Sequence, residues 1–109
     1  MLGPGKADLL ERIGETGSIA AAGRSMGMSY KRAWMLVETL NEIFADPLVT
    51  STRGGTAGGG AVLTDTGKRV LTCYREIESQ ARRSTAHEID TLSSLLKYPP
   101  GPATPDDTA

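Results

Sequence analysis

Capping signals between residues 18 and 29 constrain this chain more than any other feature. Ser18 precedes an alanine-rich segment at residues 19–25, and Gly27 follows that segment. Serine is a favoured N-cap, and a glycine just after a helix tolerates the positive φ that ends it. Ser29 then caps a further helical segment that starts at Tyr30, so only a tight turn separates the two. The sequence therefore predicts a helix-turn-helix.

Apolar periodicity predicts that the second helix of the helix-turn-helix is the longer of the two. It also predicts a further helix that precedes the helix-turn-helix in the sequence. The longer helix covers residues 30 to about 44, with apolar residues spaced by 4, 3 and 4 at Ala33, Val37, Leu40 and Phe44. Such a stripe is typical of one buried helix face. Trp34 adjoins it, so we expect Trp34 in the core rather than as a platform for a base. The additional helix starts at Pro4 and buries Leu9, Leu10 and Ile13 until Gly14 to Gly17 break the pattern.

A β-hairpin is predicted after Asp46-Pro47, which ends the longer helix. Residues 48–53 are rich in β-branched side chains and alternate in part, as in a strand. Residues 54–60 contain five glycines and form the connecting loop, and residues 61–63 return as the second strand. The hairpin would be the wing of a winged helix-turn-helix.

A long final helix is predicted to begin after Thr64, which caps it. Its apolar residues Val70, Tyr74, Ile77 and Ala81 repeat at 4, 3 and 4, the spacing of a coiled-coil seam, so we expect them to join two copies of the chain. The fold class is therefore mainly α with a small β-hairpin wing, plus a long C-terminal dimerisation helix. We divide the chain into a winged helix-turn-helix domain (1–65), a long helix (66–97) and a disordered, Pro-rich, acidic tail (98–109).

A helix-turn-helix places the start of its second helix in the DNA major groove, where base edges differ in their donors and acceptors. We expect DNA contacts from the helix-turn-helix and from the hairpin loop, where a flexible glycine segment can follow the sugar-phosphate backbone or the minor groove. These residues are Ser18, Arg24, Ser29, Tyr30, Lys31, Arg32, Met35, Arg53, Gly55, Thr56 and Gly58.

Each piece also has a plain structural explanation. A glycine between two helices is common, Lys31 and Arg32 alone fit an ordinary solvated helix face, and the glycine loop alone fits a passive hairpin tip. The loop is not a phosphate-binding P-loop, since no Gly-Lys-Ser/Thr follows it and the next element is a strand. The order of helix, helix-turn-helix, glycine-rich hairpin and long helix is much more specific than any single piece.

The charge of the chain is distributed unevenly. The formal net charge is −1, which excludes a uniformly basic coat but not a local basic face. Residues 1–83 carry eleven basic and nine acidic side chains, whereas residues 84–109 carry one and four. Between Arg24 and Arg32 there are three basic residues and no acidic one. The positive stretch therefore coincides with the helix-turn-helix.

Composition narrows the remaining classes. We see no secretory signal and no apolar run near the ~20 residues of a membrane span. The lone Cys73 fits a reducing, cytoplasmic setting, and with the single histidine, His87, it makes no metal site. No nucleophile is spaced with a base as in an enzyme. We therefore expect no catalytic residues, no metal and no cofactor.

Several motifs resemble the N-terminal domain of the ModE-type molybdate-responsive regulators, and more distantly the LysR-type regulators. They are Gly17-Ser18-Ile19, the run from Gly27 to Trp34, Glu38-Thr39-Leu40-Asn41 and the glycine-rich stretch from Gly54 to Thr64. The resemblance covers residues 2–77. It implies a homodimer joined through the helix after the wing and bound to a pseudo-palindromic operator. It also implies that residues 29–35 are the recognition helix and residues 53–60 the wing.

The same resemblance bears on ligands. Full-length members of this family carry a C-terminal molybdate-binding domain, and only about thirty residues follow the matched region here. We therefore do not expect this chain to bind molybdate or another oxyanion, although an oxyanion or metal in a dimer cleft stays open.

Our main hypothesis is a homodimeric, sequence-specific transcription regulator that binds double-stranded DNA. The alternative is a protein-interaction module of the same fold that dimerises with a longer regulator and modulates it. An enzyme ranks last.

Overall fold

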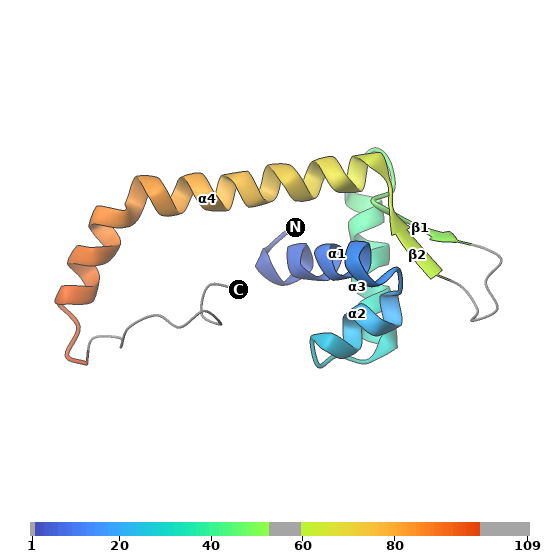
Figure 1. Cartoon of the computed structure of the whole chain (residues 1–109), viewed down its shortest axis with the longest axis horizontal. Coiled ribbons are helices and arrows are strands. Elements are labelled where there is room, and N and C mark those ends of the chain that lie inside the picture. The colour runs from blue at the N-terminus through green and yellow to red at the C-terminus, as the bar shows by residue number, and fades with distance from the viewer. Residues whose placement is uncertain (1, 53–59, 99–109) are drawn as a thin grey trace. The chain divides into compact units, whose positions relative to one another are not determined.

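The computed structural model describes residues 2–52 and 60–98. The elements run in the order α1 (Pro4–Thr16), α2 (Ile19–Ser25), α3 (Tyr30–Ile43), β1 (Val49–Thr52), β2 (Gly60–Leu63) and α4 (Asp65–Ser94) (Figure 1). The chain forms two compact units, Met1–Arg75 and Glu76–Ala109. The first holds α1–α3, the hairpin and the start of α4, and the second holds the rest of α4.

The core of the first unit is apolar and draws on every element before α4. Leu9, Leu10 and Ile13 of α1 are fully buried, as their spacing predicts. Leu40 of α3 and Leu48, just before β1, are the other large side chains with no exposed surface. Val70 and Leu71 of α4 pack against this cluster and cover one side of it. Among the residues described, no polar or charged side chain is buried.

The helices α2 and α3 pack closely because small residues face each other. A Cβ added at Gly23 would lie 2.9 Å from the Cβ of Ala33, so the two helices leave no room for a larger pair there. The turn between them closes with hydrogen bonds from the Met26 and Met28 amides to the carbonyl of Gly23, each 3.0 Å long. Gly27 in this turn has φ +72°, a conformation that glycine adopts without strain.

The hairpin is antiparallel, with Val49 opposite Leu63 and Thr52 opposite Gly60. Its two strands form the whole sheet seen in residues 2–52 and 60–98. The amide of Ala61 in β2 donates to the carbonyl of Gly17 at 2.9 Å, which ties the hairpin to the end of α1.

A polar cluster holds α3, β1 and α4 together where the hairpin begins and ends. The Asn41 Oδ1 accepts from the amides of Leu48 and Val49 at 2.9 and 3.1 Å, and its Nδ2 donates to the Val49 carbonyl at 3.1 Å. The Thr64 hydroxyl donates to the carbonyl of Pro47 at 2.7 Å and accepts from the amide of Gly67 at 2.9 Å. These contacts fix where the wing leaves the helices.

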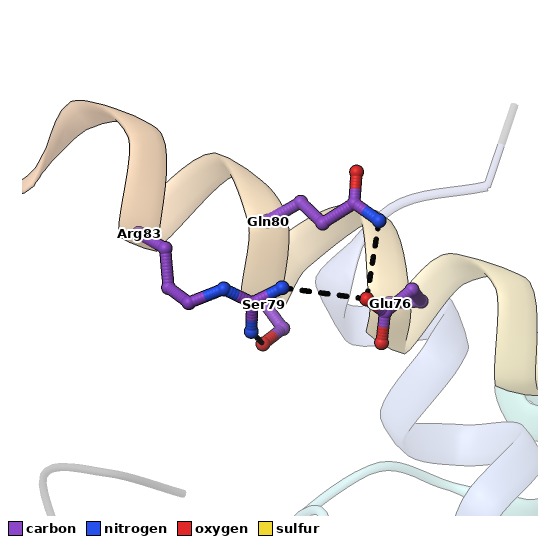
Figure 2. Close-up of polar contacts among 4 residues, drawn as sticks. All are labelled: Glu76, Ser79, Gln80 and Arg83. Carbon is purple, nitrogen blue, oxygen red and sulfur yellow. Dashed lines mark hydrogen bonds and ion pairs between the residues drawn. The ribbon is translucent and has the colours of Figure 1, made fainter.

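The second unit contains a cluster of polar contacts among four residues of α4 (Figure 2). Glu76 accepts from Gln80 at 3.1 Å and from Arg83 at 3.4 Å, and Arg83 also donates to Ser79. Helix geometry turns about 100° per residue, so Ala81 and Leu92 lie opposite this polar cluster, and Ile77 lies on the flank next to Ala81. The apolar residues of the second unit are strongly exposed: Ile77, Ile89, Leu92, Leu95, Leu96 and Tyr98.

The predicted fold class is confirmed: the chain is mainly α with a β-hairpin and a long final helix. The expected N-caps Ser18, Ser29 and Thr64 all accept amide hydrogen bonds. The prediction that Gly14 starts the break after the first helix was wrong. α1 continues through Gly14 to Thr16, because only Gly17, with φ +69°, has the left-handed conformation that ends it.

Candidate nucleic-acid interface

The predicted recognition helix is part of α3, which begins at a well-formed helix start. The Ser29 hydroxyl oxygen accepts from the amide of Arg32 at 3.2 Å, and in α2 the Ser18 hydroxyl accepts from the amide of Ala21 at 3.0 Å. Each cap satisfies one amide of the first turn and leaves others pointing outward at the positive end of the helix dipole. Both helix starts therefore favour an anion such as a DNA phosphate.

Three basic side chains of the helix-turn-helix are exposed: Arg24 at the end of α2, and Lys31 and Arg32 in the first turn of α3. Within residues 2–52 and 60–98, none of the three has an ion pair or a side-chain hydrogen bond. Their charges are thus not neutralised by neighbouring carboxylates. Arg75, by contrast, pairs with Asp8 at 2.6 Å and with Glu11 at 3.5 Å.

The outward face of α3 carries large side chains as well as charge. Tyr30 is 57% exposed and Met35 is 54% exposed. Lys31, Met35 and Arg32 also border a shallow open depression along this helix. The N-terminal half of α3 therefore presents cations, a phenol and a thioether to solvent.

The prediction that Trp34 lies in the core was wrong, since its exposed fraction is 45%. Trp34 follows Ala33, so it lies about 100° round the helix from the residue that meets α2. Ala33 is the residue that faces α2, because a Cβ added at Gly23 would lie 2.9 Å from the Ala33 Cβ. The stripe is narrower than the sequence suggested and consists of Ala33, Val37 and Leu40.

Four candidates for DNA contact lie outside the described residues. They are Arg53, Gly55, Thr56 and Gly58, all within residues 53–59. The other seven lie in α2, in α3 or at their N-caps, so the structure brings them into one helix-turn-helix.

The four candidates for dimerisation differ in exposure. Val70 packs against the core of the first unit, and Tyr74 is half-buried. Ile77 is 64% exposed, and Ala81 is also exposed.

Sequence reasoning missed Asn41 as a residue that positions the hairpin. The signal was available, because Asn41 comes one turn after Val37 on the buried side of α3. A polar residue at such a position needs hydrogen-bond partners inside the fold. Trp34 gave no comparable signal.

A metal site and a membrane-spanning helix are both absent from the described residues. No three side chains among His, Cys, Asp and Glu come together there to hold a metal ion. None of the described helices is both long enough and apolar enough to cross a bilayer.

Comparison with known proteins gives a family. Residues 6–68 match the model of the bacterial regulatory helix-turn-helix proteins of the lysR family. The molybdenum-pterin-binding protein MopB of Rhodobacter capsulatus is 49% identical over 78 residues, which are 72% of this chain and 29% of that protein. The molybdenum transport protein ModE of Azotobacter vinelandii is 40% identical over 88 residues, which are 81% of this chain and 31% of that protein. The chain thus spans about three tenths of the length of these curated relatives.

Solved structures agree on the fold. The crystal structure of the CbnR DBD–DNA complex matches with a TM-score of 0.64 and 21% identity, over 84% of this chain and 99% of that one. Full-length LysG from Corynebacterium glutamicum matches with a TM-score of 0.61 and 19% identity, over 87% of this chain and 31% of that one. On the match of its helix-turn-helix, hairpin and first turn of α4, the chain belongs to the lysR family of bacterial regulatory helix-turn-helix proteins.

Proposed function

We propose that this chain is a homodimeric, sequence-specific DNA-binding transcription regulator that acts in the cytoplasm. The N-terminal half of α3 enters the major groove and reads base edges through Arg32, Lys31 and Met35. Arg24 and the N-caps Ser18 and Ser29 contact phosphates beside it. The wing, residues 53–60, contacts the backbone or the minor groove.

One observation carries this proposal: Lys31 and Arg32 are exposed at the positive end of α3 without an acidic partner in the described parts of the chain. Cations that stabilise a fold are usually paired or spread over a surface. Here they project from a helix start that itself favours an anion. An arginine in this position can donate two hydrogen bonds to the O6 and N7 of guanine.

The relatives add support of two kinds. One matched protein with a similar fold was solved in complex with DNA. Another, from Escherichia coli K12, is named a DNA-binding transcriptional dual regulator and is 39% identical over 71 residues. Those residues cover 65% of this chain, and the aligned part is 27% of that protein.

Dimerisation is proposed through α4, the helix after the wing. Ile77, Ala81 and Leu92 would be buried against a second copy, while the polar cluster around Glu76 stays in solvent. Two recognition helices related by a twofold axis would read the two halves of a pseudo-palindromic operator.

The test is selection of bound fragments from genomic DNA, followed by affinity measurements with Arg32→Ala. We expect this variant to lose ~1–3 kcal/mol of specific binding free energy. For the wild type, a dimer with about three to five phosphate contacts in each half should show a slope of log affinity against log salt of roughly −5 to −9.

A matched control is Glu42→Ala, which removes a charge from the exposed side of the last turn of α3. We expect it to change specific affinity far less than Arg32→Ala. Wild-type affinity in Arg32→Ala would reject this placement of the recognition helix. A monomer without affinity for any duplex at low salt would favour the interaction module that pairs with a longer regulator.

A further inference from the structure

We infer that Trp34 is a specificity-determining residue, whose indole contacts the C5-methyl group of a thymine in the major groove. This inference rests on the proposed function, and it adds the class of base that one side chain recognises.

The exposure of Trp34 contributes nothing to the stability of the first unit. An indole is the largest apolar side chain, and leaving 45% of it in water forgoes stabilisation that burial would supply. Within the described residues no ring contact or hydrogen bond of Trp34 occurs. The indole is thus free to meet another molecule.

The position of Trp34 on α3 favours duplex DNA as that other molecule. Lys31, Trp34, Met35 and Glu38 are all exposed and follow the spacing i, i+3, i+4 and i+7 along α3. Side chains at this spacing form one line along a helix, which is the line that meets successive base edges when a helix lies in the major groove. Lys31 starts this line and Arg32 is the next residue, and these two cations favour the negatively charged duplex over an apolar protein surface.

Base chemistry then selects thymine. Thymine is the one DNA base that presents an apolar group, its C5-methyl, in the major groove, and apolar side chains recognise it by direct contact. Met35, the next residue along α3, is also exposed and adds a second apolar side chain to the same line. Stacking of the indole on a base face is not proposed, since bases in a duplex expose edges rather than faces.

The experiment uses the full chain and the duplex obtained by selection from genomic DNA. Trp34 is the single tryptophan, so its fluorescence reports this contact directly, while anisotropy of a labelled duplex reports binding independently. We expect the bound protein to show a changed emission and reduced quenching by acrylamide. Binding with unchanged quenching would overturn the inference and leave the proposed function intact, whereas absence of binding would overturn both.

Specificity is tested by replacing each thymine of the duplex with uracil, which lacks only the methyl group. In the wild type, one replacement in a half-site should weaken binding about fourfold, the value for burying one such group. The same replacement should not change the affinity of Trp34→Ala. Trp34→Phe, which keeps an aromatic ring, should recover part of the sensitivity to uracil. The salt slope should stay unchanged, because an apolar contact releases no counterions.

Ile43→Ala is the matched control, because Ile43 is also 45% exposed but lies in the last turn of α3. It should keep the full uracil effect. If no thymine position is sensitive in the wild type, or if sensitivity persists in Trp34→Ala, the assignment is wrong. Shielding of Trp34 by self-association without DNA would also overturn it and assign this face to a second copy.

Discussion

Replacing Asn41 by alanine tests how the wing is held. Its amide makes three hydrogen bonds to Leu48 and Val49, two residues that are almost fully buried. A typical intramolecular hydrogen bond contributes about 0.5–1.5 kcal/mol net, and a buried backbone group left unpaired costs about 1–3 kcal/mol. Because Asn41 is itself partly exposed, water can replace some of these bonds. We expect Asn41→Ala to lower the free energy of unfolding by ~2–4 kcal/mol.

The assay is urea unfolding followed by circular dichroism, at one protein concentration because the proposed dimerisation would make stability depend on concentration. Asn41→Asp keeps both acceptor bonds but places a carboxylate oxygen against the Val49 carbonyl where the amide donated, so it should also be less stable than the wild type. Glu42→Ala, the exposed neighbour, should change stability by less than about 0.5 kcal/mol. A loss below about 0.5 kcal/mol in Asn41→Ala would refute the claim that this amide holds the strand start.

Three further predictions concern packing and assembly. Alanine in place of a helical glycine usually stabilises by about 0.5–1 kcal/mol. Gly67→Ala should instead destabilise in urea unfolding, because its Cβ would collide with the carbonyl oxygen of Leu48. Gly5→Ala in α1, with open space around the added Cβ, should not destabilise. Leu40→Ala should cost about 2–5 kcal/mol in the same assay, and a smaller loss would show that the core collapses around the gap. Ile77→Glu should weaken the dimer at least about tenfold in analytical ultracentrifugation, whereas Ser79→Ala on the polar side should not.

Local signals were sufficient for most of the fold. Ser18, Ser29 and Thr64 start helices because their hydroxyls accept first-turn amides, and Gly17 and Gly27 end helices because they tolerate positive φ. Each of these choices depends on a few neighbouring residues. The N-caps and the element order could therefore be predicted without coordinates.

The candidate site was predicted in part. The exposure of Tyr30, Lys31, Arg32 and Met35 follows from the apolar stripe, because residues away from that stripe face solvent. The contacts expected from Arg53 and its glycine loop stay predictions. The dimerisation expected from the seam from Val70 to Ala81 also stays a prediction. Val70 already packs against the core of the first unit.

Two features of the protein depend on the tertiary structure: the exposure of Trp34 and the hydrogen-bond partners of Asn41. The sequence by itself determined which segments are helical and where they begin, since capping and periodicity act over a few residues. The exposure of Trp34 depends on which sides of α3 the other segments cover. The position of Asn41 one turn after Val37 could be read from the sequence, but its hydrogen-bond partners depend on where β1 starts after the chain changes direction. Both depend on contacts between different segments of the chain, and no local sequence pattern shows how close those segments lie in space.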